Sequence, residues 1–406
     1  MEVKQYDDEL PVRVPLLLYS YDTKEKEVCD IVEIKDTVVD IKPTTALNFT
    51  GTTSYLNTTF NGLNALSGAG VLSIPYALSS GGWLSLILLF IIASATFYTG
   101  LLIKRCIEID PNIRSYPDVG NKAFGKKGAT LVSVFLSLEL YMVATGFLIL
   151  AGDNLHNLFP DMKIDIDGVV NIGGKPSFVV ILALIMTPTV WINDMTTLSY
   201  VSATGVLASL VILGSVLWSG LSDDIGFPYT LQFNEKSNTI LVLTYASMAI
   251  LGYLMFGSEV QSQITLNLPT HKFSSKVAIY TALINPIAKY ALTLRPIVDA
   301  IEDCVQLRRC YSLILRTTLV CSSVIVALTV PFFGYLMSLV GAFLSVTTSI
   351  LLPCFCYLKI SGAYRKIGLE LAISSSIVLM GLIILVIEHI RLYIILVSKK
   401  SMDDVG

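Results

Sequence analysis

The sequence predicts an all-α polytopic membrane protein in which ten spans are visible. Of its 406 residues, 53% are hydrophobic and 15% are charged, and the mean hydropathy is +0.69. A soluble core of this length cannot bury so much apolar surface. A spanning helix takes about 20 apolar residues, because the hydrocarbon is about 30 Å thick and each residue rises about 1.5 Å. The stretches that meet or approach this length are 57–80, 82–103, 128–152, 177–193, 197–220, 239–257, 274–296, 313–337, 338–358 and 367–397.

The first 55 residues differ from the rest of the chain. They hold eleven acidic residues between Glu2 and Asp40, against six basic residues between Lys4 and Lys42. Such a charged segment with few long apolar runs is typical of disorder. We therefore expect an acidic, mostly disordered cytosolic tail over 1–55, a transmembrane domain over 56–398 and a short C-terminal tail over 399–406.

Composition and motifs exclude several classes of protein. The net charge of −3 and the pI near 5.7 give no basic surface for nucleic acid. The seven cysteines contain no C-x-x-C pair, so no disulfide framework or metal site is predicted. H-E-x-x-H and G-x-S-x-G are absent from the sequence, which holds three histidines. We expect neither an enzyme nor a bound cofactor.

Basic loops set the expected orientation. Lys104, Arg105 and four more basic residues up to Lys127 follow the second span, which the positive-inside rule places in the cytosol together with the N-terminus. Arg308 and its neighbours mark a second basic loop, and Arg365 lies in a third. Five spans separate the first loop from the second, so the span count and the charges conflict. Either a helix is missing between 221 and 238, where the sequence is too short and too polar for one, or the topology is unusual.

The first span carries the most informative chemistry. Gly68 and Gly70 weaken its helix and Pro75 removes a backbone amide, so that backbone groups between Ser67 and Val71 lose their helical partners. Such groups are tolerated in a membrane only beside a cavity or a ligand. A broken helix can offer its amides and positive end to a carboxylate, and its carbonyls to a cation or amine. Close helix packing through small residues is the alternative.

Glu139 and Lys289 are two of the charged residues that lie inside predicted spans. Glu139 is mid-span, where a charge is costly and is usually functional. It carries a proton in one interpretation and makes a structural hydrogen bond in the other. Lys289, with Tyr290 beside it, lies one turn past Asn285. Its ammonium group replaces a bound cation or pairs with Glu139, or else extends toward the membrane surface.

Several motifs resemble the amino acid/auxin permease family, and most closely the vacuolar amino acid transporters of plants. The similarity extends from about Ser54 to Val397. The motifs are NGLNALSGAGVLSIPYA at 61–77, ELY at 139–141, GDNL at 152–155, GYLMFG at 252–257, QITLNLP at 263–269 and NPIAKYA at 285–291.

The resemblance implies an eleven-span permease of the leucine-transporter type, with two inverted five-helix repeats. It implies secondary active transport of neutral amino acids by alternating access, driven by a proton gradient, in the vacuolar membrane; the plasma membrane is the alternative. Substrate-binding residues by this resemblance and by position are Asn64, Ser67, Gly68, Ala69 and Gly70. Proton-coupling candidates are Glu139 and Lys289, with Pro75, Asn285 and Tyr290 in supporting roles.

The chain departs from the family pattern at one place. Family members have a broken sixth span that mirrors the first, whereas here Phe227 is followed directly by Pro228 and a polar stretch. The sixth span of the expected eleven is therefore absent. The alternative function is a transport-incompetent variant that acts as a sensor or regulator, in association with a full-length homologue. The expected partners are otherwise an amino acid and the lipid bilayer.

Overall fold

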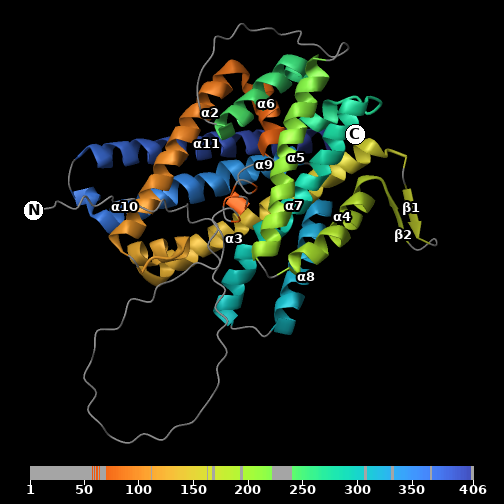
Figure 1. Cartoon of the computed structure of the whole chain (residues 1–406). Helices are drawn as coiled ribbons and strands as arrows, with labels where there is room; N and C mark the ends of the chain where they lie inside the picture. Colours follow the sequence, from red (N-terminus) through yellow and green to blue (C-terminus); the bar gives the residue numbers. More distant parts are fainter. Residues whose placement is uncertain are drawn as a thin grey trace, which may run out of the picture.

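A computed structural model describes most of the chain (Figure 1). The described residues are 70–110, 112–161, 163–166, 170–192, 195–221, 240–305, 309–330, 333–365 and 368–403, together with Asn57, Thr59, Asn61, Gly62 and Asn64. The predicted tail over 1–55 and the predicted gap between 221 and 238 lie outside these residues.

The described chain is almost entirely helical, which confirms an all-α polytopic membrane protein. A single antiparallel hairpin, β1 (Lys163–Ile166) with β2 (Val170–Gly173), separates α3 from α4. The helices are α2 (Gly70–Ile109), α3 (Tyr116–Leu158), α4 (Lys175–Val190), α5 (Met195–Leu221), α6 (Ile240–Phe256), α7 (Phe273–Val305), α8 (Arg309–Thr329), α9 (Phe333–Leu339), α10 (Leu352–Ser361) and α11 (Leu369–Asp403). Two π-helical stretches, Val340–Ser345 and Thr347–Leu351, join α9 to α10 and are called the π segment here.

The predicted count of ten spans is not confirmed. Seven of the described helical stretches are long and apolar enough to cross a membrane. The first two predicted spans meet in the single element α2, in which Gly82 interrupts the helix with a φ of 59°. Helices α4 and α6 have 16 and 17 residues, fewer than a full crossing takes. The predicted boundary at 337/338 is wrong, because α8 ends at Thr329, two residues before a proline in the sequence.

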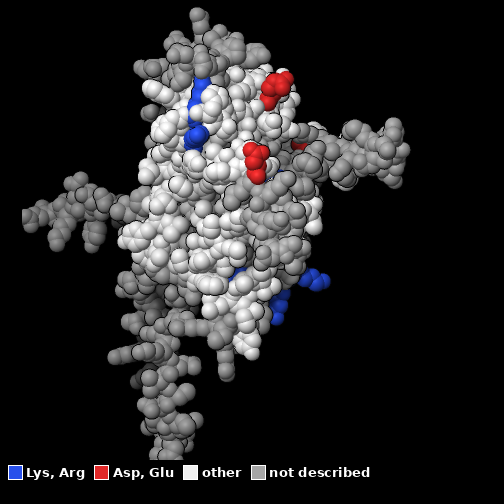
Figure 2. Space-filling model, turned by 90° about the vertical axis from the view of Figure 1, so that its right-hand side faces the viewer, with Lys and Arg blue, Asp and Glu red and all other residues white. Residues whose placement is uncertain are grey.

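Burial separates inner from outer helices. The most apolar windows of α7 and of the stretch Leu336–Ser361 are 61% buried, against 11% for α11 and 17% for α2. Large apolar side chains cover the outer helices, with Phe97 71% exposed and Tyr200 70% exposed. On the face in Figure 2, charged side chains gather toward the two ends and the band between them is mostly uncharged. Lipid is the environment that suits such a surface.

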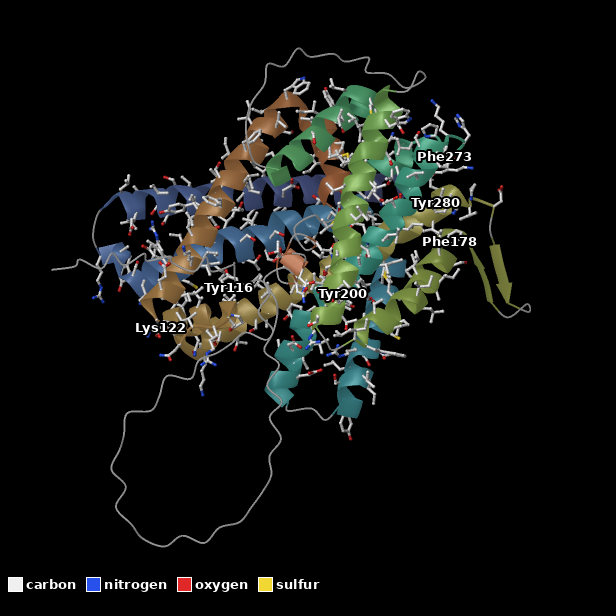
Figure 3. All side chains as sticks on the ribbon, viewed as in Figure 1. Tyr116, Lys122, Phe178, Tyr200, Phe273 and Tyr280 are labelled. Atoms are coloured by element: carbon white, nitrogen blue, oxygen red, sulfur yellow. The ribbon has the colours of Figure 1, made fainter. Side chains whose placement is uncertain are left out.

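The basic loops lie together at one end of the molecule. Asp153 near the end of α3 pairs with Lys175 at the start of α4, so α4 returns toward the start of α3. The end of α4 meets α8, where Arg316 donates to the Val190 carbonyl at 2.9 Å. We call this the basic end and the opposite one the hairpin end. Figure 3 shows Tyr116 and Lys122 far from Phe178 and Phe273.

Helices α5 and α6 follow one another in sequence and yet run in the same direction. Ser219 near the end of α5 contacts Ser274 at the start of α7, and Ser209 contacts Asn285, so α5 and α7 are antiparallel. Helix α6 also ends at the hairpin end, because the loop that follows it bonds Asp153 through Gln263. This parallel course puts the α2–α3 and α7–α8 loops at one end, and it removes the conflict between charge and span count.

Candidate functional site

The predicted substrate residue Asn64 is fully buried between α5 and α7. Its Nδ2 donates to the Ala288 carbonyl of α7 at 3.3 Å. A side chain at Gly205 of α5 would overlap with the Asn64 amide and contact Ala288 at 3.0 Å. The first span therefore approaches α7 only because α5 has no side chain at this position.

A second polar layer lies one helical turn along α5 and α7. The Nδ2 of Asn285 donates to the Ser209 hydroxyl at 3.0 Å, and this hydroxyl donates to the Gly205 carbonyl at 3.0 Å. Tyr290 shares a hydrogen bond of 2.6 Å with Ser323 of α8. The predicted supporting residues Asn285 and Tyr290 thus hold α7 against α5 and α8.

Several buried polar atoms of this region have no hydrogen-bond partner within the described residues. The Oδ1 atoms of Asn61, Asn64 and Asn285 and the hydroxyl of Ser202 are buried and make no hydrogen bond within the described residues. Leaving such groups unpaired costs about 1–3 kcal/mol each, and a water or a ligand donor removes the cost. Amide oxygens are acceptors, which suits an ammonium group.

The remaining predicted residues are placed as follows. Lys289 is 2% exposed on α7, directly after Ala288, so it does not extend to the membrane surface. Gly70 begins α2, and Pro75 is buried within α2 against Gly252 of α6. Ser67, Gly68 and Ala69 lie outside the described residues, so their roles stay predictions.

Glu139 contacts the π segment. Its carboxylate oxygens accept from the hydroxyls of Ser345 and Thr348, each at 2.5 Å. Within the described part of the chain, Glu139 forms no ion pair. The salt bridge to Lys289 that the sequence suggested is therefore not among its contacts, which are made with hydroxyl groups.

Sequence reasoning missed the contribution of α5. Ser202, Gly205 and Ser209 lie along this helix at intervals of three and four residues, which is typical of small residues at helix interfaces in membranes. That spacing could have been found. Ser345 and Thr348 carried no signal, because single hydroxyls are common in apolar helices.

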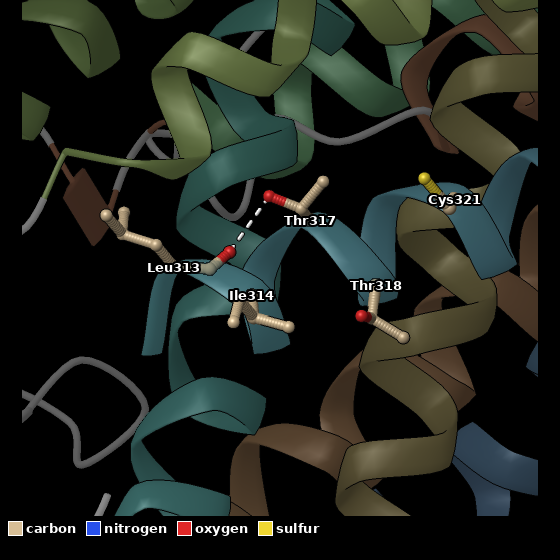
Figure 4. Close-up of a pocket in the computed structure, with 5 residues that line it drawn as sticks. All are labelled: Leu313, Ile314, Thr317, Thr318 and Cys321. Carbon is tan, nitrogen blue, oxygen red and sulfur yellow. Dashed lines mark hydrogen bonds between the residues drawn. The ribbon is translucent and has the colours of Figure 1, made fainter. Parts of the chain in front are cut away.

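Two further features lie away from this cluster. The Asp153 side chain is 14% exposed and contacts both Lys175 and Gln263. Gln263 also accepts from Asn154 at 2.7 Å, which ties α3 to the loop after α6. A groove on α8, lined by Leu313, Ile314, Thr317, Thr318 and Cys321, opens among exposed side chains (Figure 4).

Polar side chains from several apolar helices are buried inside the molecule, an arrangement typical of membrane transport proteins. A family model described as "Transmembrane amino acid transporter protein" matches residues 51–228 and 232–394. The chain belongs to this family of transmembrane amino acid transporters, as its motifs predicted.

Similar proteins include three from Arabidopsis thaliana. Amino acid transporters AVT1J and AVT1I are each 50% identical over 380 residues, covering 83% and 82% of this chain and 90% and 92% of those proteins. Amino acid transporter AVT1B is 39% identical over 350 residues, covering 76% of this chain and 65% of that protein.

These alignments also contain positions that this chain lacks. The first has 380 positions, but 83% of 406 residues is about 337, so about 43 positions have no counterpart here. The family match is interrupted between 228 and 232, within the stretch that joins the parallel helices α5 and α6.

Proposed function

We propose that the chain is a secondary active transporter that moves neutral amino acids by alternating access, coupled to protons. The observation that carries the proposal is the set of buried amide oxygens without partners on Asn64 and Asn285. They lie where the first span, α5 and α7 meet, in a chain of an amino acid transporter family.

The polarity of this region suits an amino acid zwitterion. The ammonium group of the substrate donates to the amide oxygens of Asn64 and Asn285, which satisfies two unpaired acceptors. The carboxylate takes the backbone amides of Ser67, Gly68, Ala69 and Gly70, by the helix-break chemistry expected of the first span. The small residues of α5 leave little room beside Asn64, in agreement with a compact substrate.

Two buried groups serve proton coupling. Glu139 is held by hydroxyls, and Lys289 lies beside Ala288, whose carbonyl accepts from Asn64. A charge at either position is costly inside the membrane, so a change of protonation biases the helices that surround it. The coupled ion is a proton, and no bound cofactor takes part.

The proposed location is the vacuolar membrane, with the N-terminus in the cytosol. It rests on the resemblance to plant vacuolar transporters and on the basic loops, which lie together at one end. The hairpin end then faces the vacuolar lumen. Microscopy of the tagged protein in plant cells tests this location. A signal at the plasma membrane would contradict the vacuolar location and leave the transport proposal unchanged.

Uptake into proteoliposomes tests this function. The purified chain and its Glu139→Gln variant are supplied with labelled neutral amino acids, with and without an imposed pH gradient. Saturable uptake that depends on the gradient in the parent chain and is lost in the variant is expected. No uptake by the parent, but uptake after a spanning helix is inserted between Phe227 and Pro228, would favour a regulatory variant instead.

A further inference from the structure

We propose that Ser345 and Thr348 are positioning residues that let Glu139 exist in both protonation states, and that the π segment is the element that responds to this change. The inference rests on the proposed coupling role of Glu139. It adds the partners that make the protonation reversible.

The contacts of Glu139 come from hydroxyls rather than from a cation. The hydroxyls of Ser345 and Thr348 face the same side of the π segment, because both contact the Glu139 carboxylate. Each donates to a different carboxylate oxygen at 2.5 Å, the short distance of a hydrogen bond to a charged acceptor. An arginine or lysine partner would favour only the charged carboxylate, because it has no acceptor.

A hydroxyl group, in contrast, both donates and accepts. When a proton from the aqueous side adds to one carboxylate oxygen of Glu139, the new O–H donates to the Thr348 hydroxyl oxygen. The Thr348 proton then turns to the Leu344 carbonyl, which already lies 3.0 Å from Oγ1. Every donor keeps an acceptor in both states, and no heavy atom has to leave its place.

The backbone around these hydroxyls is held by side chains as well. Tyr116 of α3 donates to the Thr348 carbonyl at 2.6 Å, and Thr99 of α2 donates to the Ser349 carbonyl at 2.6 Å. A π-helical register disturbs the usual bonding of carbonyls, and such stretches occur often at functional sites. Protonation of Glu139 turns two charge-assisted hydrogen bonds into weaker neutral ones, in a segment whose register is already irregular, so the attachment of this segment to α3 weakens.

Among the described residues, no neighbouring charged group takes the place of the two hydroxyls as a partner of the Glu139 carboxylate. Tyr116 interacts electrostatically with Glu139 and lies among the thiols of Cys106, Cys354 and Cys356, all of them neutral when protonated. Helix α7 carries the buried Lys289. On α11, Glu370 in the first turn pairs with Arg105, and Glu388 further along the helix accepts from Ser338 at 3.2 Å.

Infrared difference spectroscopy of the purified chain in lipid tests the inference directly. The carboxyl band that is lost in Glu139→Gln is followed against pH in the parent, Ser345→Ala, Thr348→Val and Thr348→Ser. Removing one donor from the carboxylate should raise the midpoint of this titration by about one pH unit. Thr348→Ser should restore the parent midpoint. Thr347→Val is the matched control, because the hydroxyl of the half-buried Thr347 donates to the Phe343 carbonyl and, within the described residues, makes no contact with Glu139.

The same variants are then compared in amino acid uptake. The pH at half-maximal uptake should rise by the same amount in Thr348→Val, while exchange of labelled for unlabelled amino acid without a gradient continues. An unchanged infrared midpoint in both Ser345→Ala and Thr348→Val overturns the inference, whatever the uptake. A shifted midpoint in a chain that takes up no amino acid supports the inference and contradicts the proposed function.

Discussion

Gly205 decides how closely the first span approaches the inner helices. The Asn64 amide occupies the space where a side chain at this position would lie, and the Ala288 carbonyl holds that amide. Asn64 was predicted from the sequence as part of the site, whereas Gly205 was not. The reason is that Asn64 belongs to a local motif, while the need for a glycine arises only when two distant segments meet.

Gly205→Ala should therefore impair transport more than a glycine substitution ordinarily does. The overpacking is expected to cost about 1–3 kcal/mol, which corresponds to a rise of about 5- to 150-fold in the KM for amino acid uptake. Gly214→Ala on the same helix is the control, because nothing lies within 4 Å of an added side chain there. Equal KM values for the two variants would contradict this account of the contact.

At the scale of elements, one glutamine side chain joins the loop after α6 to the end of α3 at the hairpin end. Gln263 donates to Asp153 and accepts from Asn154, so the loop between α6 and α7 is tied to the end of α3. Lys175 of α4 completes this arrangement through Asp153. Three segments far apart in the sequence are thus joined by side chains from two motifs that had been recognised separately.

Gln263→Ala removes both bonds from a buried position and leaves the Asn154 amide without this acceptor. The expected loss is about 2 kcal/mol, or a fall of about 2–4 °C in the melting temperature measured in detergent. Gln261→Ala, at an exposed position of the same loop, should melt like the parent chain. Equal melting temperatures of the two variants would show that the Gln263 side chain does not stabilise the contact between this loop and α3.

Much of the element pattern could be predicted from apolar length alone. The break at Gly82 and the helices α5 and α7 follow the predicted segments closely. The end of α8 could not be placed, because the apolar run continues past Thr329 without a change in composition. The π segment was missed for a similar reason, since its register depends on contacts with α2 and α3 rather than on its own sequence.

For the whole molecule, the parallel course of α5 and α6 is the feature that the sequence indicated only indirectly. Alternating crossings would place the basic loops on opposite sides, and the charges contradicted this. The contacts at the hairpin end agree with the charges. A count of apolar segments cannot show that two successive helices run in the same direction, but the distribution of charges can, because it reports orientation independently.

Labelling with a membrane-impermeant maleimide tests this topology. Cysteines introduced at Asp161 and His271, both exposed at the hairpin end, should react from one side of sealed vesicles. A cysteine at Lys127, exposed at the basic end, should react only from the other side. The parent chain corrects for native thiols such as Cys321. Reaction of position 271 from the same side as position 127 would mean that α6 and α7 are inverted.

The shared direction of α5 and α6 also bears on how the chain is inserted during synthesis. In a regular polytopic protein each helix takes its orientation from the one before it, because successive helices cross the membrane in alternating directions during synthesis. Helix α6 cannot inherit its direction from α5 in that way. The second half must therefore be oriented by its own cationic segments, those around Arg309 and Arg365, which are retained on the ribosome side. Correct biogenesis of the molecule then depends on two independent topogenic signals rather than one.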